Sequence, residues 1–277
     1  YAHAGGPYTG PPMPTPMLQI RSGVVELTMT GYDVLGRVRM PFRAARSPLR
    51  VPVAVRDDGS VHYRAFRAVP HSLNLGANQS GKSVYQRGLV KELAAQPVAL
   101  VGIDCKEGVE LAPLDRRFTA LADNPDTAAD LLDALVEEMA ARFQTIRAAQ
   151  RISADTPDAE ITSDIWGLPE RLRPVPIVVV IDEVAELLLI SNAAQKKRRE
   201  RIITNLIRLA QLSRAAGIYL EICGQRFGAE RGYGATRLRA QLTGRTSHRV
   251  NHEGSAKMAF GDISPDAITA VLSIPPD

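Results

Sequence analysis

A run of eight residues, GANQSGKS at 76–83, has the composition needed to hold a phosphate. Gly76 and Gly81 let the chain curl so that several backbone N–H groups face one point, which suits a phosphate oxygen. Lys82 supplies a flexible cation for the outer phosphates, and the hydroxyl of Ser83 can ligate magnesium. The pattern predicts a P-loop, and its alternative is a polar turn between a strand and a helix. The predicted phosphate-binding residues are Gly76, Ala77, Asn78, Gln79, Ser80, Gly81, Lys82 and Ser83.

A second group with catalytic chemistry follows the apolar run IVVVI at 177–181. The run leads into Asp182 and Glu183, the place where a P-loop enzyme needs a carboxylate for its magnesium. We expect Asp182 to hold the magnesium through its waters, together with Ser83, and Glu183 to polarise the attacking water as general base. Alone, an Asp-Glu pair after a strand is usually a solvated turn. With a P-loop upstream, it predicts nucleoside triphosphate hydrolysis.

A third candidate lies after the segment GIYLEIC at 217–223, which continues into Gly224 and Gln225. The amide side chain of Gln225 at the end of such a strand could sense the γ-phosphate while holding the attacking water. The alternative is a surface glutamine in a loop.

The elements that would position these residues form an alternating pattern. Continuous apolar segments are typical of parallel strands covered on both faces, and stripes at three- and four-residue spacing are typical of helices. The residues after the P-loop are expected to form a helix with Val84, Leu89 and Leu93 toward the core. The predicted strands are 72–76, 98–104, 175–182 and 217–223, and the helical stripes lie in 126–150 and 198–214. This alternation predicts a doubly wound α/β domain with a mainly parallel sheet. The P-loop lies one hundred residues before Asp182, with another strand-helix unit between them, and this spacing suits a RecA-like, additional-strand P-loop ATPase.

Three segments are predicted along the chain. Residues 1–22 are rich in Pro and Gly and read as a tail or linker, and residues 23–67 form a small β-rich lead-in that includes a strand, a turn and a strand near its end. Residues 68–277 form the P-loop domain, in which the polar stretch 151–174 is expected to be a surface insertion.

The composition sets limits on function. Of the 277 residues, 45% are apolar and 23% are charged, as in ordinary globular proteins. The apolar run VPIVVVI falls well short of the roughly 20 residues that cross a bilayer, so no transmembrane helix is expected. A first residue of Tyr1, without a signal sequence, suggests a fragment. Cys105 and Cys223 are expected to be buried thiols in a cytoplasmic protein. The net charge of +4 permits a polyanionic partner.

Five motifs together resemble the FtsK/SpoIIIE family of DNA-translocating motor ATPases over roughly residues 70–262. They are, in the family's order, GANQSGKSV, IDCKEGVEL, VVVIDEVAELL, LAQLSRAAGIYLEICGQR and GRTSHRV. The lack of Pro in IDCKEG and the departure from ATQRP at CGQRFG make the chain look most like the TraB-type proteins of mycelial actinobacteria. Those proteins are similar motors that move plasmid DNA between cells during conjugation.

The resemblance implies roles for individual residues. Lys82 and Ser83 match the family's phosphate and magnesium positions, Asp182 and Glu183 its second motif, and Gln225 its polar sensor. Arg214 matches the position from which the family sends an arginine finger into the next subunit. Arg245 matches a further family arginine and is the alternative finger. From the residues alone, either arginine could equally be a surface or salt-bridging residue.

The resemblance also implies ATP and Mg²⁺ as cofactors and a homo-hexameric ring with double-stranded DNA in its channel. Two basic segments could contact that DNA. The segment 228–239 is expected to be a mobile loop with Arg231, Arg237 and Arg239, suited to following a phosphate backbone. The basic run 195–201 is either a DNA contact or a solvated helix face. Association with the cell membrane is implied by kinship alone.

Two other functions share these motifs. One is an ATPase of the same superfamily that drives protein secretion, which would differ only in its pore. The other is a ring-assembly module that binds nucleotide without hydrolysing it. Against the second, Lys82, Ser83, Asp182 and Glu183 are all present.

Overall fold

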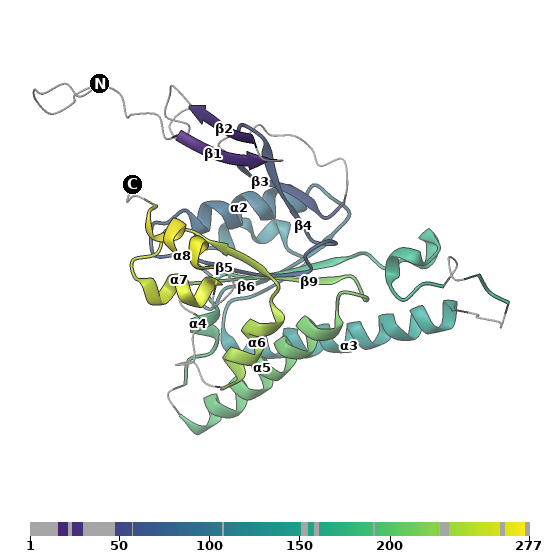
Figure 1. Ribbon diagram of the computed structural model, residues 1–277. Coiled ribbons are helices and arrows are strands. Elements are labelled where there is room, and N and C mark those ends of the chain that lie inside the picture. Colours follow the sequence, from purple (N-terminus) through teal and green to yellow (C-terminus); the bar gives the residue numbers. More distant parts are fainter. Residues whose placement is uncertain are drawn as a thin grey trace, which may run out of the picture. The chain divides into compact units, whose positions relative to one another are not determined.

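The computed structural model describes residues 16–21, 24–29, 48–56, 58–106, 108–150, 155–157, 161–190, 192–225, 227, 233–260 and 264–274 (Figure 1). These residues divide into two compact units. The smaller unit contains β1 and β2 with residues 53–56 and 58–62. The larger contains residues 48–52 and everything described from Tyr63 onward.

Two short two-stranded sheets precede the main sheet in the chain. β1 (Pro16–Arg21) pairs antiparallel with β2 (Val24–Met29). β3 (Arg50–Val55) and β4 (Val61–Ala65) form a second two-stranded sheet. Between β3 and β4 the Arg56 N–H donates to the Ser60 carbonyl at 2.8 Å, and Gly59 takes a positive φ of 79°. The predicted strand, turn and strand in this part of the chain are therefore confirmed.

Six strands form the main sheet, in the order β10-β5-β9-β8-β6-β7, and every neighbouring pair is parallel. Their bounds are β5 (His71–Leu75), β6 (Ala99–Ile103), β7 (Ala120–Ala122), β8 (Ile177–Ile181), β9 (Ile218–Gly224) and β10 (Gly244–Ser247). The predicted α/β fold with a parallel sheet is confirmed. Because Leu75 pairs with Gly224 and Ile181 with Ile222, the carboxyl ends of β5, β9 and β8 lie at the same edge of the sheet.

Helices cover both faces of this sheet, with α2 on one side and α3 and α5 on the other (Figure 1). The α-helices in the described part of the chain are α2 (Lys82–Leu93), α3 (Pro125–Ala149), α4 (Val184–Leu187), α5 (Ala193–Leu212), α6 (Tyr233–Gln241), α7 (Glu253–Phe260) and α8 (Pro265–Leu272). Three short 3₁₀ helices are η1 (Ala112–Arg117), η3 (Ile165–Gly167) and η4 (Glu170–Leu172). This coverage explains the continuous apolar strands: all residues of β5, β8 and β9 are buried.

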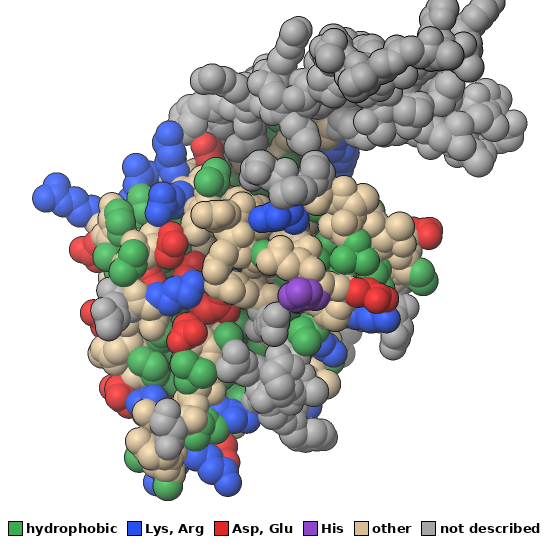
Figure 2. Space-filling view, turned by 90° about the vertical axis from the view of Figure 1, so that its left-hand side faces the viewer, with side chains coloured by type: hydrophobic (Ala, Val, Ile, Leu, Met, Phe, Trp, Pro, Cys, Tyr) green, Lys and Arg blue, Asp and Glu red, His purple; other side chains and the backbone are tan. Residues whose placement is uncertain are grey.

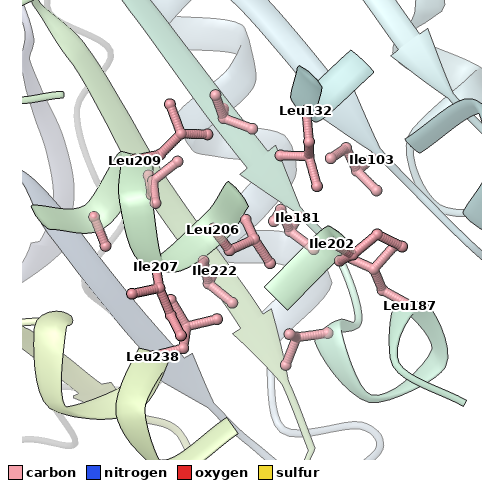
Figure 3. Close-up of a cluster of buried hydrophobic side chains, with 14 of the residues drawn as sticks. Ile103, Leu132, Ile181, Leu187, Ile202, Leu206, Ile207, Leu209, Ile222 and Leu238 are labelled. Carbon is pink, nitrogen blue, oxygen red and sulfur yellow. The ribbon is translucent and has the colours of Figure 1, made fainter. Parts of the chain in front are cut away.

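The core lies between α5 and the central strands (Figure 3). Leu206 and Ile202 of α5 pack in one cluster with Ile181 of β8 and Ile222 of β9. Leu132 of α3 joins the same cluster. The apolar stripes predicted for these helices therefore form part of the hydrophobic core, and they have no catalytic role.

An ion-pair ladder joins α5 to α3 on the surface. Arg198 bonds the carboxylate of Asp126 at 3.0 Å, and Arg201 bonds Asp130 at 2.8 Å and also Asp133. Two cations of the basic run 195–201 are thus engaged within the chain. For these two arginines the solvated-face interpretation fits better than a DNA contact.

The structure differs from the sequence-based expectations for one buried position and one loop. Val84 is 73% exposed, because it lies five residues before Leu89 and so points to another side of the helix, whereas Leu89 and Leu93 are buried as predicted. The segment expected to be a loop at 228–239 is helical from Tyr233 onward as α6, and Arg231 lies outside the described residues.

The stretch 151–174 also does more than cover the surface where it is described. Ile165 and Leu168 are buried against Ile146 of α3, and the Trp166 indole N–H donates to the Tyr219 hydroxyl at 3.0 Å. Among the described helices, none combines the length and apolar character needed to cross a membrane.

Candidate nucleotide-binding site

The residues 76–81 form a loop that leaves β5 and enters α2. The Gly76 N–H donates to the Gly224 carbonyl at 3.1 Å and the Ala77 N–H to the Arg249 carbonyl at 2.9 Å, so β9 and the segment after β10 hold the loop from two sides. Gly81, which precedes α2, has φ at +87°, a conformation that favours glycine. Since Gly81 has no side chain with which to cap α2, the first N–H groups of this helix remain suited to an anion.

Gly76 is required by its surroundings. A Cβ atom at this position would lie 2.4 Å from the Ser80 hydroxyl oxygen and 2.8 Å from the Cβ atom of His248. The Ser80 hydroxyl is buried, and among the described residues it has no hydrogen-bond partner. A tight loop with a buried unpaired hydroxyl and an uncapped helix fits a phosphate group.

Lys82 lies against the carboxylates that follow β8. Its ammonium nitrogen donates to the Asp182 carbonyl at 3.0 Å and lies 3.5 Å from Asp182 Oδ1 and 3.8 Å from Glu183 Oε2. All three side chains are buried. The structure therefore brings together the cation and the two carboxylates that the sequence separates by one hundred positions.

Glu183 is held in a defined position. The N–H groups of Ala185 and Gln225 donate to its carboxylate, at 3.3 Å and at 3.1–3.2 Å. Burial raises the pKa of Glu183, and Lys82, Lys106 and the two N–H donors partly offset that rise. A buried carboxylate with a raised pKa is suited to accepting a proton from water.

Gln225 connects this carboxylate to the loop. While its backbone N–H bonds Glu183, its side-chain amide donates to the Asn78 side-chain oxygen at 2.8 Å. The end of β9 and the P-loop are thus directly linked, so a change at one can reach the other.

Ser83 and Asp182 are the predicted metal ligands. Ser83 lies in the first turn of α2 and Asp182 at the end of β8, with its Oδ1 near Lys82. In the part of the chain that the structure describes, no three His, Cys, Asp or Glu side chains gather as a metal cage. A buried carboxylate at the end of one strand and a hydroxyl in the first turn of the P-loop helix suit Mg²⁺, which keeps several waters and takes ligands from phosphates.

The two candidate finger arginines lie in different parts of the fold. Arg214 is exposed in the turn before β9, at the opposite edge of the sheet from Gln225. Arg245 of β10 donates to the Arg239 carbonyl near the end of α6, and burial followed by the charge of Arg239 lowers its pKa. Within one chain, neither arginine joins the P-loop.

Two side chains near the site were not among the predicted site residues. Lys106 lies 3.4 Å from Asp182 Oδ2 and 3.7 Å from Glu183 Oε2. His248 packs beside Gly76 and edge-on to Tyr85, with ring centroids 5.7 Å apart. Burial, and then the charge of Lys82, lower the pKa of His248. Lys106 belongs to the quoted motif IDCKEGVEL and His248 to GRTSHRV. Lys106 is a polar residue shortly after the predicted strand 98–104, a signal that could have found it, whereas His248 follows no predicted strand.

Figure 2 shows the face of the molecule on which α4 and α7 lie, the left-hand side of Figure 1. Acidic and basic side chains lie side by side on this face. α4, which directly follows Glu183, lies on this face (Figure 1). A parallel sheet that carries a glycine loop after β5, a lysine at a helix start and a carboxylate pair after β8, with β9 between these two strands, defines a P-loop nucleotide-binding domain.

Comparison with known proteins identifies the family. The chain belongs to the FtsK/SpoIIIE family, whose profile matches residues 35–229. It is 69% identical over 259 residues to the transfer protein TraSA of Streptomyces ambofaciens, an alignment that covers 94% of this chain and 62% of that protein. The chain thus spans less than two thirds of this relative's length.

Solved structures share the fold. The pCW3 conjugation coupling protein TcpA, in its monomer form with ATPγS, superimposes with a TM-score of 0.70 at 22% identity, over 91% of this chain and 70% of that one. The cytoplasmic domain of the type VII secretion ATPase EccC of Thermomonospora curvata gives a TM-score of 0.61 at 25% identity, over 83% and 26%.

Proposed function

We propose that this chain is an ATP-hydrolysing motor that moves double-stranded DNA in plasmid transfer between cells. Residues 68–277 form the motor domain, and the subunits of a homo-hexameric ring share the hydrolysis of ATP. The observation that carries the proposal is the meeting of Lys82, Asp182 and Glu183 at the carboxyl edge of the sheet, next to the Asn78–Gln225 bond. The likeness to a transfer protein supports the choice of DNA as substrate.

Each residue has a distinct task in this mechanism. The loop amides and Lys82 hold the phosphates, so the Lys82 ammonium must turn from Asp182 toward the nucleotide when it binds. Ser83 and Asp182 would hold Mg²⁺, which neutralises charge on the phosphates. Glu183 takes the proton of the attacking water. Gln225, bonded to Asn78 on one side and to Glu183 on the other, reports the state of the phosphates to β9.

A finger from a neighbouring subunit would complete the site, and exposure favours Arg214 for this role because Arg245 is engaged with α6 of its own chain. We expect Arg214→Ala to keep nucleotide binding and to lower turnover. Arg245→Ala should instead lower the thermal stability, because the Arg239 carbonyl loses its donor. The measurements are phosphate release and a melting curve for each variant. Loss of turnover at unchanged stability in Arg245→Ala would make Arg245 the finger.

The main alternative is an ATPase that drives protein secretion, and the structural likeness to EccC is the observation in its favour. The mildly basic net charge of +4 and the transfer-protein relative favour DNA. By kinship we also propose that the domain lies in the cytoplasm and works at the cell membrane.

Steady-state ATP turnover with and without linear duplex DNA, at low and moderate salt, tests the proposal. We expect DNA to stimulate turnover and the stimulation to fade as salt rises, because backbone contacts release counterions. Lys82→Ala should show no turnover under any of these conditions. Turnover that ignores DNA would contradict the DNA motor and favour a polypeptide substrate.

A further inference from the structure

The loop after β6 is built around one buried carboxylate. Asp104 is fully buried, and its carboxylate accepts hydrogen bonds from the N–H groups of Lys106 at 3.1 Å, Glu110 at 2.9 Å and Leu111 at 2.9 Å. Its own N–H donates to the Ala122 carbonyl at 2.8 Å, which ties the loop to β7. The backbone at Lys106 is therefore fixed by the fold.

This fixed loop aims Lys106 at the catalytic carboxylates. Its ammonium nitrogen lies 3.4 Å from Asp182 Oδ2 and 3.7 Å from Glu183 Oε2. Lys82 lies on the other oxygen of Asp182, and it shares Glu183 Oε2 with Lys106. The Lys106 side chain is one-third exposed, so it can still move. Partial burial alone would lower the pKa of Lys106, but the charges of Asp182 and Glu183 outweigh it and raise the pKa.

Charge balance indicates what must happen when a nucleotide enters. Without nucleotide, two lysines balance two carboxylates. A triphosphate with one magnesium brings net negative charge, and it brings more than the corresponding diphosphate. A divalent cation at Asp182 would repel the ammonium of Lys106 and leave it only Glu183 Oε2, which it shares with Lys82, so a further anion would attract it. The terminal phosphate is the new anion that distinguishes the triphosphate from the diphosphate.

We propose that Lys106 is a second phosphate-directed lysine, held by Asp182 and Glu183 before nucleotide binds and released to the terminal phosphate of ATP. The inference rests on the proposed nucleotide-binding function. It assigns Lys106 the task of distinguishing ATP from ADP, beside Lys82, which serves both nucleotides.

The test compares the affinities of the whole chain for a non-hydrolysable ATP analogue and for ADP, both with Mg²⁺, by titration calorimetry. We expect Lys106→Ala to lower the affinity for the ATP analogue about tenfold or more, the usual effect of losing a charge-assisted hydrogen bond. The affinity for ADP should fall less than about threefold. Lys106→Arg, which keeps the positive charge, should recover part of the affinity for the ATP analogue that Lys106→Ala loses. Arg87→Ala is the matched control, because Arg87 pairs at 3.2 Å with Glu110 of the same loop but does not reach the carboxylates. It should leave both affinities unchanged.

Two results would overturn the inference. An equal loss for both nucleotides would mean that Lys106 only shapes the site, and unchanged affinities would mean that it is a surface cation. Partial rescue by Lys106→Arg with a retained ATP preference supports the inference even if Lys106→Ala folds poorly. If the unaltered chain binds neither nucleotide, the proposed function itself fails. This outcome differs from an equal loss of affinity and from unchanged affinities in Lys106→Ala, because it concerns the unaltered chain.

Discussion

Glu183→Gln is expected to lower ATP turnover at least about a hundredfold while nucleotide still binds. The amide has the shape of the carboxylate, and an amide oxygen in the place of Oε1 can still accept from the N–H groups of Ala185 and Gln225. It cannot take a proton from water, so the loss falls on the chemical step. The measurements are phosphate release at saturating ATP and the affinity for a non-hydrolysable analogue.

Glu186→Gln provides the matched control for this prediction. Glu186 lies three positions further along, on α4, and the same substitution removes one negative charge close to the site. We expect near-normal turnover in this variant. Turnover that survives in Glu183→Gln would show that another group acts as the base.

The sequence predicted those parts of the site that depend on local pattern. The P-loop is encoded by adjacent residues, and the apolar run 177–181 marks β8 and hence the position of Asp182 and Glu183. The strands at 71–75, 99–103 and 218–224 follow for the same reason, because burial on both faces demands continuous apolar side chains.

The parts that escaped prediction depend on pairings between distant segments. Nothing local in the motif IDCKEG indicates that Lys106 will reach Asp182, because that contact requires β6 and β8 to be neighbours. The contact of His248 with the P-loop likewise requires β10 to lie beside β5. β10 itself, with the sequence GRTS, lacks the apolar run of the inner strands because it is an edge strand with one neighbour.

A buried ion network behind the P-loop depends on one further carboxylate, Glu221 of β9. Glu221 is fully buried and accepts hydrogen bonds from the Arg64 guanidinium at 2.8 Å, from the Tyr85 hydroxyl at 2.7 Å and from the Asn74 side-chain amide. Arg64 is also buried and lies over the ring of Phe66, with 3.9 Å between its central carbon and the ring centroid. The network ties β4, β5 and β9 to the helix that carries Lys82.

Glu221→Ala is expected to reduce the free energy of unfolding by about 3–5 kcal/mol, the usual cost of leaving one partner of a buried ion pair without the other. Arg64 would keep its charge in a site that water does not reach, and Tyr85 and Asn74 would each lose an acceptor. The measurement is denaturant unfolding at neutral pH, with unfolding followed by the signal of Trp166.

The double variant Arg64→Met with Glu221→Leu removes both charges. Its free energy of unfolding shows how much of the loss in Glu221→Ala comes from leaving the Arg64 charge buried without a partner. Because replacing both partners with apolar residues is often neutral, we expect it to recover most of the stability lost in Glu221→Ala. Tyr85→Phe, which removes one hydroxyl from the same network, should cost only about 1 kcal/mol. A double variant no more stable than Glu221→Ala would show that the pair itself holds β9 against the P-loop helix. The network would then contribute to the geometry of Gln225, which lies four residues after Glu221 and directly follows β9.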